Sequence, residues 1–182
     1  MYLALDTEFA GLDVSYSLLT LSFIVADTDF NIVDRLDLKV KPDHRKYVVD
    51  PVSMSVNKID LLKHDEEAIS YKAAKTLLYS FLRTNYKKEG LLNAIAHNHQ
   101  LDYDYIFTYL LSKNSWDQFV KYRVLDTGGL TEFLSDKGKI EAKESSLVYW
   151  TKYFGIKVEG IPHTARYDAE VTLRLYEKLK EL

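Results

Sequence analysis

Two carboxylates, those of Asp6 and Glu8, lie two positions apart in the apolar stretch LALDTEFAGL at residues 3–12. In a β-strand, residues i and i+2 point to the same face, so both carboxylates would project from one side of the strand. Like charges this close repel each other, and one group must take up a proton unless a cation lies between them. The pair therefore predicts either a cation site or a strand end at which both acids reach solvent.

A further acid follows a short apolar strand. The segment IAHNHQLDYDYI (residues 95–106) passes from that strand into a helix and places Asp102 at the start of the helix. An aspartate there often serves as an N-cap, because its side chain accepts hydrogen bonds from free backbone N–H groups. The same interpretation applies to Asp104, while His97 and His99 have the ordinary interpretation of turn or surface residues. The segment alone leaves both a structural and a chemical role open.

The third signal is an acid on the inward side of a predicted C-terminal helix, HTARYDAEVTLRLYEKL (residues 163–179). Asp168 lies on or beside the stripe of small and apolar residues, where an unpaired carboxylate is costly. His163 directly follows Pro162, in a segment that can hold its ring over the same opening. The structural alternative is an ion pair of Asp168 with Arg166 or Arg174, but these side chains point elsewhere on a helical wheel.

The elements that must position these side chains follow from the hydrophobic patterning. Strands are predicted at residues 2–9, 17–27, 31–41, 91–97 and 122–127. Helices are predicted at residues 71–88, 102–113, 129–135, 145–154 and 164–181. The segment that contains Pro42 and Pro51 is expected to be a loop. Three consecutive strands followed by alternating helices and strands predict one α/β domain over residues 1–182, with a mixed five-stranded sheet flanked by helices.

The composition excludes several other kinds of protein. The 182 residues contain no cysteine, which excludes disulfides, thiolate zinc sites and a cysteine nucleophile. No signal peptide and no membrane span are expected, so we predict a cytoplasmic protein without a membrane partner. The net charge of −3 argues against non-specific coating of nucleic acid. The fourteen tyrosines could stack on bases, although tyrosines at the edge of a core are the commoner case.

Taken together, D6-T-E8, H97-N-x-x-L-D102 and H163-x-A-x-x-D168-A resemble the three motifs of the DnaQ-like DEDDh 3′→5′ exonuclease family, in the family's order and spacing. The resemblance covers nearly the whole chain and implies a ribonuclease-H-like fold. The segment VLDTGGLTEFL (residues 124–134) is also similar to the strand and helix between the family's second and third motifs. A sister branch has tyrosine four positions before its last aspartate. Because Thr164 occupies that position and Tyr167 has the wrong spacing, the histidine branch is the better match.

The resemblance implies that two divalent cations, Mg²⁺ or Mn²⁺, are held by four carboxylates, those of Asp6, Glu8, Asp102 and Asp168. Asp6 would bridge the two ions, Glu8 and Asp168 would complete the site of the ion that carries the attacking water, and Asp102 would serve the second ion. His163 would be the general base. Oxygen ligands suit such hard cations, and a pair of them would neutralise the four carboxylates so that a phosphodiester can enter.

The resemblance also marks residues for contact with the substrate. Backbone amides and apolar surface of the segment after Glu8 would pack on the terminal sugar and base, and its residues are Phe9, Ala10, Gly11 and Leu12. Asn98 is predicted to make a polar contact to the substrate. Ala10 replaces a polar residue that is frequent in the family, and Leu101 replaces an aromatic one. Asp104 is the rival for the second-motif acid, but Asp102 has the family's offset from the preceding His-Asn pair.

These features predict a metal-dependent 3′→5′ exonuclease that releases nucleoside 5′-monophosphates from single-stranded ends of DNA or RNA. One alternative is a proofreading subunit that acts with a DNA polymerase through a surface the sequence does not locate. Another is a non-catalytic nucleic-acid-binding domain of the same fold. The presence of all four acids and of the histidine favours the enzyme over the binding domain.

Overall fold

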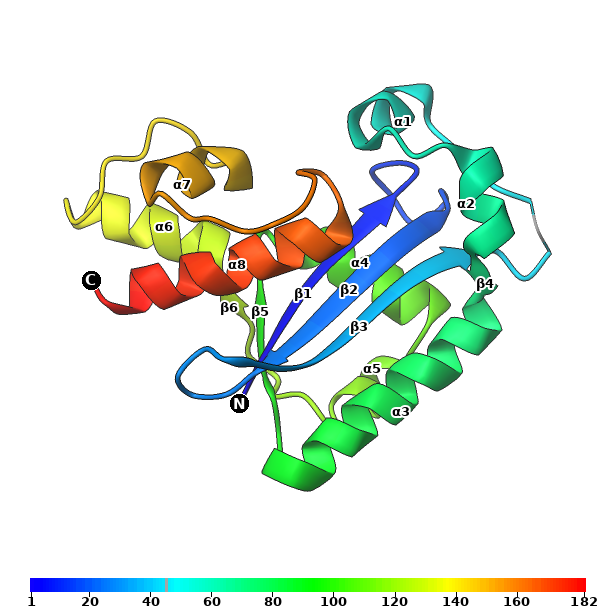
Figure 1. Ribbon diagram of the computed structural model, residues 1–182, viewed down its shortest axis with the longest axis horizontal. Helices are drawn as coiled ribbons and strands as arrows, with labels where there is room; N and C mark the ends of the chain where they lie inside the picture. The colour runs from blue at the N-terminus through cyan, green and yellow to red at the C-terminus, as the bar shows by residue number, and fades with distance from the viewer. Residues whose placement is uncertain (45) are drawn as a thin grey trace.

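A mixed sheet of six strands runs through the computed structural model, which describes residues 1–44 and 46–182 (Figure 1). The strands are β1 (Tyr2–Phe9), β2 (Leu18–Ala26), β3 (Ile32–Lys41), β4 (Ile69–Ser70), β5 (Asn93–Ala96) and β6 (Leu125–Asp126). Their order in the sheet is β4-β3-β2-β1-β5-β6. The first three strands pair antiparallel, whereas β5 runs parallel to β1, β6 to β5 and β4 to β3. The strand that carries the first two acids therefore lies inside the sheet.

Eight helices in the described chain cover this sheet and its ends. They are α1 (Pro51–Asn57), α2 (Leu61–Glu67), α3 (Tyr71–Glu89), α4 (Gln100–Tyr109), α5 (Lys113–Trp116), α6 (Thr127–Asp136), α7 (Leu147–Tyr153) and α8 (Ala165–Lys180). The predicted mixed α/β architecture is confirmed, with six strands instead of the predicted five. Among the helices of the described residues, none has the length and apolar character that a membrane span requires.

The sequence prediction was wrong for the segment between β3 and α3, which was expected to be a loop. It contains two short helices and β4, the sixth strand, which pairs with the end of β3. Asp50 caps α1 by accepting a hydrogen bond from the Ser53 N–H, and Asp60 caps α2 in the same way. All residues of α1 are described and none is buried, so no apolar stripe revealed this helix. The predicted helix over 102–113 likewise divides into α4 and α5.

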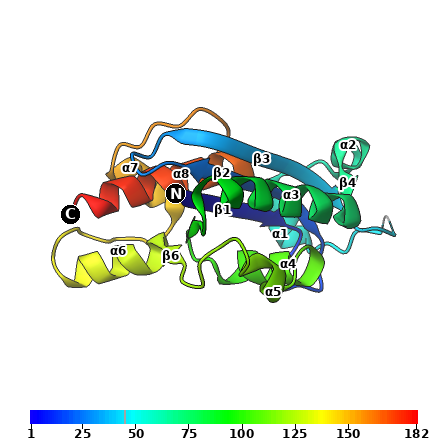
Figure 2. The same cartoon turned by 90° about the horizontal axis from the view of Figure 1, so that it is seen from below.

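The two faces of β1 pack against different helices, as Figures 1 and 2 show. Leu3 and Leu5 belong to a core cluster with residues of α3, α4 and α5. Ala4 belongs to a second cluster with Ala169 and Leu173 of α8. The alternation predicted for β1 is thus confirmed, and it directs the next two even-numbered residues of the strand toward the α8 side. The first turn of α8 lies near the end of β1 (Figure 1).

Candidate active site

Three carboxylates from β1 and α8 converge at the end of β1. Asp6, Glu8 and Asp168 each offer one ligand oxygen, and these oxygens all lie within 4.8 Å of one another. The alternation of β1 supplies the first two, and the first turn of α8 supplies the third. Several carboxylate oxygens gathered in this way are the ligands that hard divalent cations prefer. The arrangement can therefore hold a cation.

The fourth acid, Asp102, reaches the same strand from α4. Its side chain is buried, and its Oδ1 accepts hydrogen bonds from the backbone N–H of Thr7 at 2.9 Å and from the Thr7 hydroxyl at 2.7 Å. Thr7 lies between Asp6 and Glu8 in β1, so these bonds hold Asp102 beside them. The N-cap interpretation was wrong, because the N-cap of α4 is His99.

The rival acid Asp104 lies outside this cluster. It is exposed and accepts a hydrogen bond from Gln100 Nε2 at 3.1 Å, one helical turn earlier on α4. The structure thus supports Asp102 over Asp104 as the acid that joins the β1 pair.

Burial and mutual repulsion raise the pKa of the acids in this cluster. The pKa of Glu8 rises to about 7, mainly because the side chain is buried and then because Asp168 and Asp102 are close. Burial also raises the pKa of Asp6 well above its ordinary value, and the three neighbouring carboxylates add to this rise. Protonation is the alternative to a bound cation for acids packed this closely. The cluster thus needs positive charge to stay ionised.

The pKa values of Asp102 and Asp168 are also raised, although contacts with other residues act to lower them. Burial raises the pKa of Asp102 to about 7 although the hydrogen bonds from Thr7 lower it. Burial raises the pKa of Asp168 to about 6, while the charge and backbone of His163 act in the opposite direction. Glu8, Asp102 and Asp168 therefore change protonation close to neutral pH when no cation is bound.

No basic side chain of the described residues forms an ion pair with any of these four acids. Arg166 pairs instead with Asp37 at 3.6 Å, and Arg174 pairs with Glu177 at 3.1 Å. The ion-pair alternative for Asp168 is thereby excluded, because both candidate arginines have other partners. No ion pair within the described part of the chain therefore compensates the negative charge of the cluster.

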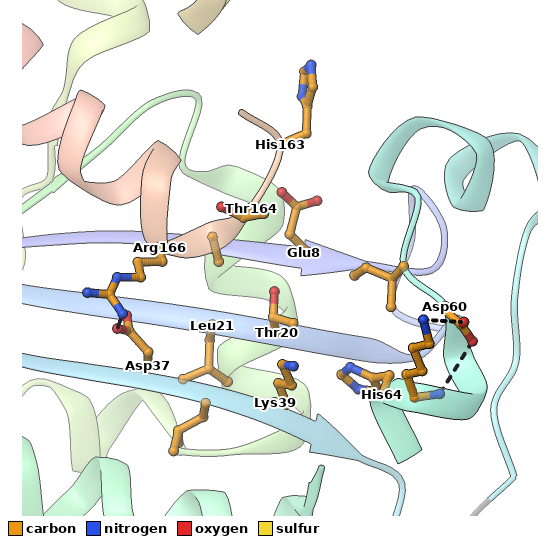
Figure 3. Close-up of a pocket in the computed structure, with 14 residues that line it drawn as sticks. Glu8, Thr20, Leu21, Asp37, Lys39, Asp60, His64, His163, Thr164 and Arg166 are labelled. Carbon is orange, nitrogen blue, oxygen red and sulfur yellow. Dashed lines mark hydrogen bonds and ion pairs between the residues drawn. The ribbon is translucent and has the colours of Figure 1, made fainter. Parts of the chain in front are cut away.

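His163 lies just before α8 at the mouth of a pocket. The pocket has a volume of ≈ 450 Å³ and is lined by Glu8, His163 and Arg166 together with residues of β2, β3 and α2 (Figure 3). The His163 backbone has φ +63°, a left-handed conformation that is uncommon for residues other than glycine. Its ring is exposed and points away from the Glu8 carboxylate in Figure 3. The histidine is at the site, but its ring must turn to reach the acids.

Four residues that follow Glu8 in the sequence were predicted to contact substrate, and one of them is largely exposed to solvent. Leu12 is 77% exposed, whereas Phe9 stacks on Tyr105 with ring centroids 4.8 Å apart. Ala10 is buried, and its N–H already donates to the Ser17 carbonyl at 2.8 Å. The Ala10 amide thus already has a hydrogen-bond partner within the chain. Gly11 is buried against Tyr16, whose ring lies where a Cβ would have to go, 2.1 Å away.

A further aspartate, Asp126 at the end of β6, had no role in the sequence analysis. It holds the loop that carries the second motif in place. Asp126 accepts hydrogen bonds from the backbone N–H groups of Asn98 and His99 and from His99 Nδ1, at 3.1, 3.0 and 2.5 Å. It also caps α6 by accepting from the Gly128 N–H at 2.8 Å. Burial alone would raise the pKa of Asp126, but these hydrogen bonds outweigh it and lower the pKa. An N-cap aspartate followed by Thr-Gly-Gly was the available signal.

Asn98, predicted to contact substrate, lies against the start of α6. It is exposed and has φ +59°. A Cβ on Gly128 would lie 2.1 Å from Asn98 Oδ1, so a larger residue there would displace the Asn98 side chain. The structure thus places Asn98 beside the Asp126 loop.

The profile of the RNase T exonuclease family matches residues 3–176. The chain belongs to this exonuclease family. Its membership confirms the resemblance to the DnaQ-like DEDDh exonucleases and supports nuclease activity. Among curated proteins, none matches this family member by sequence.

Solved structures share the fold of this exonuclease-family chain. Escherichia coli exonuclease I in complex with a dT13 oligonucleotide is 17% identical with TM-score 0.79, over 98% of this chain and 40% of that one. Exonuclease X in complex with 5′-overhanging duplex DNA is 18% identical with TM-score 0.69, and the match covers 100% of this chain and 92% of that one. S. pombe Pop2p in its Mg²⁺- and Mn²⁺-bound form is 14% identical with TM-score 0.69, and the match covers 99% of this chain and 82% of that one. The chain thus spans well under half of exonuclease I.

Proposed function

We propose that this chain is a metal-dependent 3′→5′ exonuclease that acts on single-stranded ends of DNA or RNA and releases nucleoside 5′-monophosphates. The observation that carries the proposal is the convergence of three carboxylates, with ligand oxygens within 4.8 Å of one another, beside the buried Asp102. Membership of an exonuclease family supports the same reaction class.

The acids of the cluster fit a pair of divalent cations. The donor set is made of carboxylate oxygens, and the described residues supply no basic partner for it. Asp6, Glu8 and Asp168 would hold one ion, and Asp6 together with Asp102 would hold the other. When bound, such ions supply positive charge that stabilises the attacking and leaving oxygens of a displacement at phosphorus. The Mg²⁺ and Mn²⁺ bound in Pop2p, a chain of the same fold, support this assignment.

The protein's own residues would orient the reactants and move the proton. Thr7 fixes Asp102 through two hydrogen bonds, which keeps the α4 acid aligned with the β1 pair. His163 would accept a proton from the attacking water, because an imidazole changes charge near neutral pH. This role requires its ring to turn from the outward position of Figure 3 toward Glu8. Leu12, exposed at the end of β1, would pack against the terminal base.

The preference for single strands is supported by one structural neighbour, exonuclease I, which is bound to a dT13 oligonucleotide. Exonuclease X, bound to duplex DNA with a 5′ overhang, supports DNA as a substrate class without favouring single strands. Both share the fold over nearly all of this chain. We extend their nucleic-acid substrate class to the chain as part of the proposal.

Matched DNA and RNA oligonucleotides, labelled at either end, test the proposal with the purified chain in Mg²⁺ or Mn²⁺. Digestion from the 3′ end would release a 3′ label at once as a mononucleotide and shorten a 5′-labelled strand stepwise. The Asp168→Asn variant is the control for a contaminating nuclease. Intact oligonucleotides of both kinds in both metals would contradict the proposal and favour a binding domain. Release of a 5′ label first would contradict the polarity.

A further inference from the structure

A second pocket, lined by aromatic rings, lies on another flank of α4. Its volume is ≈ 500 Å³. Tyr103 and Phe107 come from α4, Trp116 from α5, and Tyr122 from the segment before β6. Consecutive residues of a helix are about 100° apart around its axis, so Tyr103 faces a different side from Asp102, which contacts β1. We call this the aromatic pocket.

The inner wall of the aromatic pocket is tightly packed. Trp116 is 1% exposed, and its ring contacts the Tyr103 ring edge to face with centroids 5.4 Å apart. The wall thus offers a ligand a fixed apolar surface.

The rim of the pocket carries positive charge that the described residues do not fully compensate. Lys113 lies over the ring of Tyr122, 4.9 Å from its centroid, and pairs with Asp117 at 2.5 Å. Arg123 is exposed and has no ion pair within the described part of the chain. One guanidinium is therefore available to an anionic group beside the rings.

One ring of the pocket, that of Tyr122, is open for stacking. Tyr122 is 80% exposed although it is a large aromatic side chain. His99 also lines the pocket, and its Nδ1 is held by Asp126 at 2.5 Å, which fixes the orientation of its imidazole. An exposed ring next to an unpaired cation is the arrangement on which unpaired bases stack in single-strand sites.

We propose that the aromatic pocket holds an unpaired nucleobase of the substrate strand, upstream of the bond that is cut. Tyr122 would stack on the base, and Arg123 would face a phosphate. A nucleotide combines an aromatic face with negative charge, and so suits both the exposed ring and the unpaired cation. The inference rests on the proposed function, because it places the 3′ end of the same strand in the carboxylate cluster. Both sites share the first turn of α4, between His99 and Asp102.

Binding of oligonucleotides of graded length to the metal-free chain tests this inference. Lengths should cover the range of about 4–16 nucleotides typical of single-strand sites, with a dinucleotide as the short reference. The wild-type affinity should rise once the strand reaches the pocket. Tyr122→Ala should lower the affinity for long strands about tenfold and leave the dinucleotide unaffected, whereas Tyr122→Phe should bind like wild type.

Two exposed residues elsewhere provide matched controls. Phe133 on α6 is 56% exposed and has Lys137 over its ring at 5.7 Å, so Phe133→Ala removes a similar cation-ring pair without an effect on binding. Arg83→Ala removes an exposed arginine from α3. Arg123→Ala, unlike Arg83→Ala, should weaken binding of long strands and reduce the salt dependence by about one phosphate contact.

The outcomes separate this inference from the proposed function. Unchanged affinity of Tyr122→Ala and Arg123→Ala for long strands would overturn the pocket assignment, even if the chain digests DNA or RNA. Failure of the wild-type chain to digest any strand would overturn the proposed function instead. Strands carrying one photoreactive base at successive positions give a measurement without mutation. Crosslinks to Tyr122 or Trp116 from one upstream position support the pocket, and crosslinks only elsewhere contradict it.

Discussion

Two acidic sites at the same end of the sheet, one on β1 and one on β6, have opposite electrostatic character. At the end of β1, Asp6 and Asp168 are pressed together with two further carboxylates, and their pKa values are raised. At the end of β6, Asp126 is also half-buried beside a helix start, yet its pKa is lowered. The difference lies in the partners. Asp126 accepts hydrogen bonds from backbone N–H groups and from His99, whereas the β1 cluster has mainly other acids as neighbours.

The comparison teaches which buried acids need something from outside the chain. An acid whose oxygens accept hydrogen bonds from N–H donors of the chain needs no further partner and stabilises the fold. Acids that raise one another's pKa need a bound cation or a proton to offset their mutual repulsion. The Thr7 hydrogen bonds to Asp102 show a mixed case, because they fix the position of the side chain but do not offset its burial. The following predictions test whether the two groups differ in this way.

The largest effect is expected from Asp168→Asn. Removing one carboxylate from the cluster should lower the rate of cleavage at least about a thousandfold, because several kcal/mol of charge stabilisation are lost. The same change relieves repulsion, so the metal-free variant should unfold at the same temperature as wild type or higher. Cleavage rates and thermal unfolding curves check both parts. If Asp168→Asn remained active, or if it were inactive because it is unfolded, the β1 cluster would not differ from Asp126 in the way described.

The next largest effect is expected from His163→Asn, which removes the proposed base. Asparagine tolerates the left-handed backbone found at this position nearly as well as histidine, so the fold should be unaffected. We expect the turnover number to fall about a hundredfold with little change in KM. Unchanged turnover would remove His163 from the mechanism.

Asp126→Asn should have the opposite pattern to Asp168→Asn. An amide nitrogen would then face N–H donors, and the cap of α6 would be weakened. We expect a loss of about 2 kcal/mol in the free energy of unfolding, or roughly 4–8 °C in Tm, whether or not metal is present. Cleavage by the folded fraction should persist. A stabilised Asp126→Asn chain would mean that the two acid groups do not differ as described.

The smallest effect concerns pH. Glu8 and Asp102, with pKa about 7, and Asp168, with pKa about 6, bind protons in the folded chain that the unfolded chain has already released. The stability they contribute is present at low pH and is lost as pH rises through these values. Without metal, unfolding free energy should thus fall by at least about 1 kcal/mol between pH 5 and pH 8. Asp126, whose pKa is lowered, contributes no change in this range.

Divalent metal provides the control for the pH prediction. Saturating Mn²⁺ should abolish the fall in stability with pH, because the cations replace the protons at the carboxylates. Denaturant unfolding at several pH values, with chelator and with Mn²⁺, measures it. The same fall with and without metal would show that it comes from groups other than the cluster.

The sequence predicted the long periodic elements and the four acids because their signals are local. The alternation of β1 placed Asp6 and Glu8 on one face, and the small-residue stripe of α8 placed Asp168 beside them. Helices α1 and α2 were missed because they bury almost nothing, although an aspartate before each, and Pro51 after the first, are recognisable start signals.

Features made by distant segments could not be predicted in this way. The donors to Asp126 come from residues 27 and 28 positions earlier, and no periodic pattern connects them. The aromatic pocket likewise joins α4, α5 and the segment before β6, so its rings had looked like ordinary core-edge tyrosines. The hydrogen bond from the Ala10 N–H to the Ser17 carbonyl depends on how the chain turns after β1. Contacts between segments far apart in the sequence decide all three.

Anomalous scattering from a crystal of the chain soaked in Mn²⁺ tests the central claim most directly. The account predicts manganese within bonding distance of carboxylate oxygens of Asp6, Glu8 and Asp168, and no manganese at Asp126. Manganese absent from the β1 cluster at saturating concentration, with its acids protonated or turned apart, would contradict it.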